Sequence, residues 1–196
     1  MLKEIFHYIY CMSIPSTIIM VLVICSLWNW LSTECNRINK KQLWQSVNRI
    51  LFVIWIVCVL YMTIIIRGSV VKINRIPFNF IVKAIKTGNE EFFRTGWMNI
   101  LLFIPGGMWL SYGTKQHTKT KQILQIIFLM TVSVFIETMQ WYYQLGTVET
   151  DDVICNSLGA IVGVTSFIWT EKFVVWFTPY FINLLNHIKQ KQNPDE

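Results

Sequence analysis

Two clusters of polar side chains stand where the surrounding sequence is apolar. In the first, within the run FLMTVSVFIETMQWYY, Glu137 is followed by Gln140 and preceded one turn earlier by Ser133. This spacing places the three side chains on one face of a helix. An ionisable residue inside a membrane-spanning helix costs about 2.5–3.5 kcal/mol and is a candidate functional group by default. Glu137 could bind a ligand or serve as a general acid or base. A glutamate paired with an arginine, or protonated among amides, is an equally good interpretation.

The second cluster opens the segment ETDDVICNSLGAIVG. Its members, at positions i, i+4, i+7 and i+11 of one helical stripe, are Asp152, Asn156, Gly159 and Gly163. The two glycines form a G-x-x-x-G, which lets another helix approach closely. We therefore expect this stripe to face the interior of a helical bundle. For Asp152, and more strongly for Asp151, the alternative is a simple preference of acidic residues for a helix start.

A third group lies in the apolar stretch over residues 98–112. Asn99 opens it, and Gly106 follows seven residues later on the same predicted face. An amide hydrogen bond between helices is the better explanation of Asn99 taken alone. The sequence Pro105-Gly106-Gly107 interrupts the stretch, and such a break is tolerated in lipid only where neighbouring protein satisfies the freed backbone groups. We expect a kinked helix that packs inside the bundle.

The composition indicates which elements carry these residues. Of the 196 residues, 54% are hydrophobic and 14% are charged, whereas a soluble domain has about 45–50% apolar and about 25% charged residues. This deficit of charge excludes a disordered chain, a disulfide scaffold and a typical cytosolic enzyme. Each spanning helix takes about 20 residues, so the chain is expected to form one membrane domain over residues 1–196. The fold class expected is all-α, a polytopic membrane helical bundle.

Five apolar stretches are long enough to be considered as spans. They are residues 14–31, 50–66, 98–112, 123–143 and 153–170. The first is interpreted as a retained span because its long apolar core ends in bulky tryptophans rather than at a small-residue cleavage site. Residues 173–188, interrupted by Pro179 and by asparagines, are expected to form an interfacial helix rather than a sixth span.

The cysteines and histidines do not form a metal-binding or disulfide pattern. The five cysteines are odd in number, no CxxC pair exists, and three of them lie inside apolar segments. They are interpreted as small buried hydrophobic side chains. The three histidines are scattered along the chain, so we expect no metal site, and we expect no cofactor. No basic run alternates with aromatic residues, so nucleic acid is not an expected partner; the lipid bilayer is.

Loop charges indicate an orientation. The loop between spans three and four carries three lysines, whereas the loop between spans four and five has no Lys or Arg. Basic short loops stay cytoplasmic, so we expect a bacterial cell-membrane protein with its N-terminus outside and its C-terminus in the cytoplasm. The loop over residues 67–97 holds six basic residues and disagrees with this alternation. It is the longest loop, and longer loops weigh less in the rule.

This orientation places every polar cluster in the outer third of the membrane. We infer an acidic pocket that is open, or nearly open, to the outside, with Arg67 or Arg75 as the expected counter-charge of Glu137. Within the basic loop, the segment PFNFIVKAIKTG favours a short amphipathic helix on the outer leaflet. The apolar face expected for this helix consists of Phe80, Ile81, Ala84 and Ile85, with Lys83 and Lys86 elsewhere.

These motifs resemble the VanZ-like family, small bacterial membrane proteins related to a teicoplanin-resistance protein. INRIPF (73–78) resembles the family's Asn-Leu-Ile-Pro-Phe segment, and NILLFIPGG (99–107) is similar to its N-[IV]-[LI]-x-F-x-P-x-G run. An E-x-x-Q and then GTVETDDVICNSLGAIVG (146–163) follow in the family's order. The matching residues are Asn99, Phe103, Pro105, Gly107, Glu137, Gln140, Glu149, Asp152, Asn156, Gly159 and Gly163. The resemblance covers residues 73–163. Arg75 stands where the family often has an apolar residue, and Glu149 where it often has Asp.

The resemblance implies lowered susceptibility to teicoplanin-type lipoglycopeptides without remodelling of the peptidoglycan terminus. The expected binding residues are the matching residues Asn99, Glu137, Gln140, Glu149, Asp152 and Asn156, together with the counter-charges expected from the orientation, Arg67 and Arg75. The expected structural residues are Phe103, Pro105, Gly107, Gly159 and Gly163.

Three functions compete at this stage. The outer pocket could engage an envelope lipid head group or the lipophilic antibiotic, and the basic loop would suit an anionic head group. A membrane enzyme acting on a lipid-linked substrate could use Glu137 and Asp152 as acid and base, although the sequence shows no nucleophile–base pair, phosphate loop or metal motif. An ion-coupled carrier is disfavoured because the chain has no internal repeat.

Overall fold

The computed structural model describes residues 13–65, 72–74, 76–88, 91–114, 118–145, 147–166, 168–170 and 172. The fold is all-α, as the sequence predicts. In chain order the elements are α2 (Ile14–Arg37), α3 (Lys41–Leu60), the π-helix η1 (Tyr61–Ile65), β1 (Lys72–Asn74), α4 (Asn79–Thr87), α5 (Glu91–Tyr112), α6 (Lys119–Tyr142) and β2 (Thr147–Glu149). A further helix covers residues 150–166 and 168–170.

Three of the described helices are long and apolar enough to cross a membrane: Ile14–Arg37, Lys41–Ile64 and Lys119–Tyr142. They correspond to the first, second and fourth predicted spans, and each is longer than predicted. That α5 and the helix over residues 150–166 also cross the membrane stays a prediction. The predicted interfacial helix over 173–188 lies outside the described residues.

The three long helices expose rows of large apolar side chains. Examples are Ile19 and Leu27 on α2, Val53 and Val57 on α3, and Ile127 and Val134 on α6. Soluble proteins rarely leave apolar areas of this extent in water. The rows face outward because a hydrocarbon environment, rather than a protein core, is their natural surrounding.

Helix α5 lies at the centre of the bundle and packs against α2, α3, α4 and α6. It carries Pro105, whose ring nitrogen has no hydrogen, so the carbonyl of Leu101 loses its usual intrahelical donor. One residue further, the indole Nε1 of Trp55 on α3 donates to the carbonyl of Leu102 at 2.9 Å. The Trp55 ring fits there because Gly106 has no side chain: a Cβ at Gly106 would lie 2.6 Å from the ring. The predicted packing of this interrupted helix inside the bundle is confirmed.

Glycines bring α5 and the helix over 150–166 into direct backbone contact. A Cβ on Gly159 would lie 2.2 Å from the carbonyl oxygen of Ile100, and one on Gly163 would lie 2.2 Å from that of Ile104. On the α5 side, Gly107 has the backbone of residues 160–164 against it. The predicted close approach at the G-x-x-x-G is therefore confirmed. Asn99 and Gly106 contact different helices, because Gly106 lies against Trp55 of α3, whereas the side-chain amide of Asn99 bonds to Asp152.

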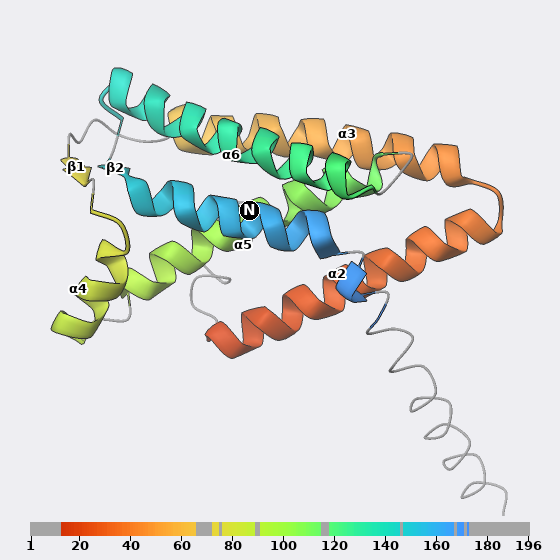
Figure 1. Cartoon of the computed structure of the whole chain (residues 1–196), viewed down its shortest axis with the longest axis horizontal. Coiled ribbons are helices and arrows are strands. Elements are labelled where there is room, and N and C mark those ends of the chain that lie inside the picture. The colour runs from red at the N-terminus through yellow and green to blue at the C-terminus, as the bar shows by residue number, and fades with distance from the viewer. Residues whose placement is uncertain are drawn as a thin grey trace, which may run out of the picture.

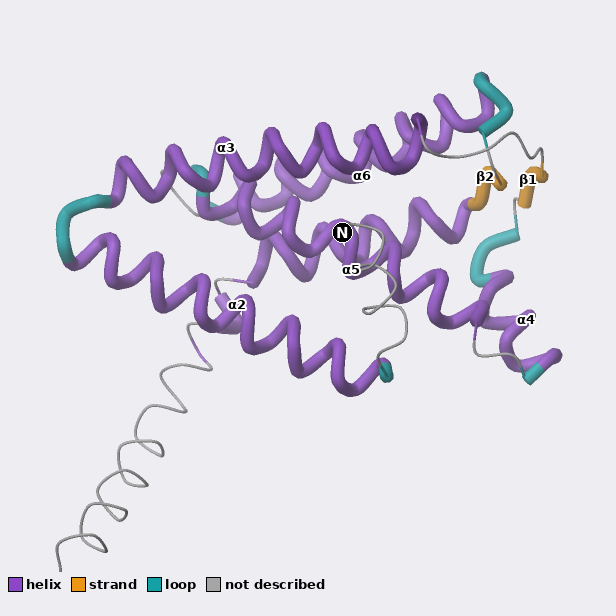
Figure 2. Tube along the Cα trace, turned by 180° about the vertical axis from the view of Figure 1, so that it is seen from behind, coloured by secondary structure: helices purple, strands orange, loops and turns teal. Residues whose placement is uncertain are grey.

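The end of α3, both short strands, α4, the beginning of α5 and the end of α6 gather at one end of the bundle (Figure 1). The connections between α2 and α3 and between α5 and α6 lie at the other end (Figure 2). Strands β1 and β2 pair in parallel, with Ile73 opposite Val148 and Asn74 opposite Glu149. This two-stranded ladder joins the segment that precedes α4 to the segment that precedes the helix over 150–166. The polar motifs of the sequence thus meet at one end, as predicted.

Candidate functional site

The loop before α4 is held by Asp151. The two carboxylate oxygens of Asp151 accept hydrogen bonds from the backbone N–H groups of Phe78 and Phe80, the second at 3.0 Å. Phe78 has a φ of 60°, a left-handed conformation that costs a bulky L-residue about 1–2 kcal/mol. A carboxylate that receives two N–H groups at a helix start offsets this cost. Asp151 therefore caps α4, a different helix from the one that the sequence suggests.

Asp152 faces the other way, toward α5. Its Oδ1 accepts a hydrogen bond from the side-chain amide of Asn99 at 2.6 Å, and its side chain is buried. The interhelical amide bond expected for Asn99 is therefore present, and its partner is the acid that the sequence selects as a site residue. Two neighbouring aspartates thus have separate tasks: one fixes α4, and the other joins the helix over 150–166 to α5.

Glu137 of α6 is buried and joins the same end of the bundle. Its Oε2 accepts the backbone N–H of Glu149 at 3.1 Å, at the end of β2. One turn back along α6, the Oγ of Ser133 accepts the side-chain amide of Asn156 at 2.9 Å. The predicted common face of Ser133, Glu137 and Gln140 is confirmed, since all three side chains are buried.

Two amide oxygens in this region have no hydrogen-bond partner among the residues that the structure describes. Gln140 is 1% exposed and donates through Nε2 to the carbonyl of Thr63 at 3.2 Å, while its Oε1 accepts nothing. Asn156 is 5% exposed, and its Oδ1 likewise has no partner. Thr63 belongs to the π-helix η1, a geometry that often marks functional positions. Unsatisfied buried acceptors are costly, so these two oxygens mark a place where a proton donor or a cation would be favoured.

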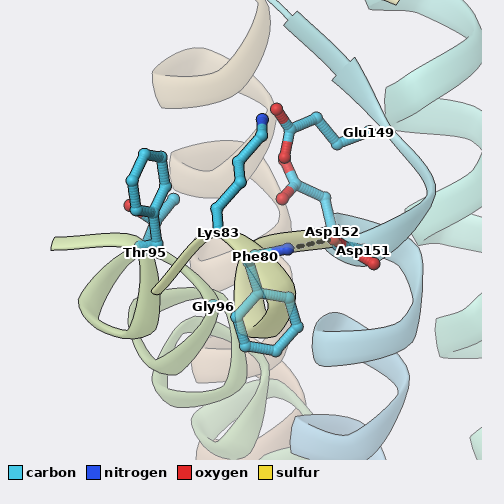
Figure 3. A pocket seen from close by; sticks show the side chains of 8 residues that line it. Phe80, Lys83, Thr95, Gly96, Glu149, Asp151 and Asp152 are labelled. Carbon is cyan, nitrogen blue, oxygen red and sulfur yellow. Dashed lines mark hydrogen bonds between the residues drawn. The ribbon is translucent and has the colours of Figure 1, made fainter. Parts of the chain in front are cut away.

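A cavity of about 160 Å³ opens between α4, α5 and the start of the helix over 150–166. Its lining residues are Phe80, Lys83, Phe92, Thr95, Gly96, Glu149, Asp151 and Asp152. Figure 3 shows the ammonium of Lys83 extending toward the carboxylates of Glu149 and Asp152. The Lys83 Nζ also lies 5.7 Å from the centre of the Phe92 ring. We refer to this hollow as the acidic cavity, because it holds three carboxylates and one ammonium.

The sequence misses part of this cavity. Lys83 is expected away from the apolar face of its helix, and the structure shows that it lines the acidic cavity. Within the apolar face expected for α4, Ala84 is buried and Ile85 is 73% exposed. Phe80, another member of this face, packs against Gly96 of α5, a contact that a helical-wheel argument on one segment does not reveal. Asp151 has a signal in the sequence, the pair Asp151-Asp152, but its partner on α4 has none.

The structure leaves other expected site residues without a test. Arg67 and Arg75, the expected counter-charges of Glu137, lie outside the described residues. No group of three or more His, Cys, Asp or Glu side chains suited to a metal ion lies among the residues that the structure describes.

Comparison with protein families decides the identity of the chain. Residues 47–185 match the model of the VanZ/LLP1 family, well over half of the sequence. The chain belongs to the VanZ-like family. No curated protein and no solved structure matches it significantly. Family membership and the apolar helices make it a membrane protein. The matched region includes the acidic cavity and the glycine contact.

The arrangement favours binding over covalent chemistry. Asp151 is committed to α4 by two hydrogen bonds, and Asp152 is committed to Asn99 by one. The Glu149 side chain, in contrast, lines the cavity together with Lys83 and the aromatic side chains of Phe80 and Phe92. Fixed carboxylates beside a lysine and aromatic faces can hold a cationic or zwitterionic group.

Proposed function

We propose that this VanZ-like protein lowers the susceptibility of its host to teicoplanin-type lipoglycopeptides through the acidic cavity, which faces the outside of the cell near the membrane surface. There it engages an envelope lipid head group or the lipophilic antibiotic itself. The observation that carries the proposal is the gathering of Glu149, Asp151 and Asp152 with Lys83 around one hollow at one end of an apolar bundle.

Two features support a binding role for this hollow. The cavity is built on a rigid frame, because Asp151 fixes α4 and the glycine contact fixes the helix over 150–166 against α5. Its wall also contains the aromatic rings of Phe80 and Phe92, which offer apolar surface and a negative face to a cation. A frame held in this way keeps the ordering cost of binding low.

The experiment compares Gram-positive strains that express wild-type protein, Asp152→Asn, Glu149→Gln or no protein, with teicoplanin and vancomycin as separate challenges. We expect wild-type protein to raise the inhibitory concentration of teicoplanin several-fold and to leave that of vancomycin unchanged. Asp152→Asn and Glu149→Gln remove cavity charge at nearly constant shape, so protection should fall to the level of the strain without the protein.

The matched control is Glu34→Gln, an equally conservative loss of one acid. Glu34 pairs with Arg37 on α2 at the other end of the bundle, so this variant should protect as well as wild type. Membrane levels are measured in every strain. The proposal would be contradicted if well-expressed wild type gave no protection. It would also be contradicted if Asp152→Asn and Glu149→Gln protected as well as wild type does.

A further inference from the structure

A second hollow lies along the side of the bundle, and it is wholly apolar. It has a volume of about 420 Å³ and lies between α2, α5 and the helix over 150–166. Ile18 and Leu22 line it from α2, Trp97 and Ile100 from α5, and Leu158 and Val162 from the third helix. We call it the lateral groove. Its volume falls in the range of about 300–1,000 Å³ that is usual for ligand pockets.

The lateral groove continues the acidic cavity along the same two helices. On α5, Gly96 lines the cavity, and Ile100, one turn later on the same face, lines the groove. On the other helix Asp151 lines the cavity and Leu158, at i+7, lines the groove. Seven helical residues correspond to about 10 Å along the axis. On this helix the residues that line the groove thus begin about 10 Å further along the axis than Asp151, which lines the cavity.

This order of polar and apolar space is that of a membrane lipid. α2, which forms one wall of the groove, is long and apolar enough to cross the membrane, so the groove lies at the depth of the acyl chains. The cavity holds three carboxylates and the ammonium of Lys83. Such a set complements a zwitterionic head group, in which the lipid ammonium meets the carboxylates and the lipid phosphate meets the lysine.

We propose that the lateral groove and the acidic cavity form one binding site for an amine-bearing phospholipid, with one acyl chain in the groove and the head group in the cavity. This inference rests on the proposed function in one respect, since it names the envelope lipid that the cavity engages. It is tested without antibiotic, so its outcome is independent of the susceptibility experiment.

The test uses the full chain in bilayer discs with equal parts of phosphatidylethanolamine, phosphatidylglycerol and phosphatidylcholine. The protein is then released into detergent, and retained lipids are counted by native mass spectrometry. We expect about one phosphatidylethanolamine per protein and at least a five-fold enrichment over each of the other two lipids. Glu149→Gln should lower this enrichment, because one carboxylate facing the lipid ammonium is removed.

Paired variants test the groove. Val162→Trp fills it and should abolish retention, whereas Ile161→Trp, at an exposed neighbouring position that does not line the groove, should leave retention intact. Leu22→Trp with Val23→Trp as its control provides the same comparison on α2 should the first pair fold poorly. Retained lipid that mirrors the mixture would overturn the proposal. Retention that survives a well-folded Val162→Trp or Leu22→Trp would overturn it too.

Discussion

Among individual residues, Asp151 has the clearest physical role. It is the only described side chain seen to accept hydrogen bonds from the start of α4, and it holds Phe78 in a left-handed conformation. Asp151→Ala should release the first turn of α4 at a cost of about 1 kcal/mol, the usual value of a lost helix cap. Amide hydrogen exchange over residues 76–88 should then become about five-fold faster, because local opening gains that free energy.

Glu149→Gln is the control for this prediction. It also alters the acidic cavity, but among the described residues the Glu149 side chain accepts no hydrogen bond from a backbone N–H of α4. Exchange over residues 119–142 should be unchanged in both variants. Equal exchange of α4 in wild type and Asp151→Ala would show that the cap does not hold this helix.

The bond between Asn156 and Ser133 joins two helices in a buried, polar part of the bundle. A double-mutant cycle with Asn156→Leu and Ser133→Ala should give a coupling free energy of about 0.6 kcal/mol, the average for such bonds in membrane proteins. Chemical unfolding of the purified variants in detergent measures it. A coupling of zero would mean that the two side chains do not interact in the membrane.

The residues that sequence reasoning identifies are those whose type conflicts with their surroundings. Glu137 and Asp152 stand out because a carboxylate in an apolar segment demands an explanation. Lys83 and Phe92 do not stand out, since a lysine or a phenylalanine near a membrane surface is ordinary. Their place in the acidic cavity depends on how α4 packs against α5. That packing is a tertiary contact, and nothing in the local sequence indicates it.

At the scale of elements, the glycine contact between α5 and the helix over 150–166 determines how closely these two helices pack. Gly163→Ala places a methyl group 2.2 Å from the carbonyl oxygen of Ile104, and a backbone atom cannot move aside as a side-chain tip can. We expect the free energy of unfolding to fall by about 1–3 kcal/mol or more, the usual cost of overpacking. Thermal melting in detergent should show a clearly lower midpoint.

Ile161→Ala on the same helix is the control, because Ile161 is exposed and makes no such approach. It should melt close to wild type. A melting point of Gly163→Ala equal to that of wild type would refute the close approach of the two helices.

The interrupted helix α5 depends on Trp55. Trp55→Phe keeps an aromatic ring over Gly106 and removes the donor to the carbonyl of Leu102. The carbonyl then loses this donor, so the variant should lose about 1 kcal/mol of unfolding free energy. Trp30→Phe is a matched change at an exposed position and should be nearly neutral. Equal stability of the two variants would contradict the role of the indole.

The apolar runs locate the helices, but they predict helix starts poorly where polar residues precede the run. The predicted starts of the first and fourth spans lie within four residues of α2 and α6, whereas α3 begins at Lys41, nine residues before the predicted second span. The predicted third span begins at residue 98, whereas α5 begins at Glu91. The apolar stretch ends at the polar residues that face the acidic cavity, but the helix continues through them.

At the scale of the whole molecule, the proposed function depends on which side of the membrane the polar end of the bundle faces. Every site residue that the structure describes gathers at that end. An outward orientation would give the acidic cavity access to envelope lipids and to an antibiotic outside the cell. Loop charges favour this orientation, with the basic loop between α5 and α6 in the cytoplasm.

The most direct test labels single cysteines in intact cells with a membrane-impermeant maleimide. Thr95 is exposed and lines the acidic cavity, and Thr118 is exposed at the start of α6, at the opposite end. Each is replaced by cysteine in a chain whose five own cysteines are changed to alanine. The account predicts that Thr95→Cys is labelled in intact cells and Thr118→Cys only after permeabilisation. Labelling of Thr118→Cys but not Thr95→Cys in intact cells would place the cavity in the cytoplasm and contradict the account.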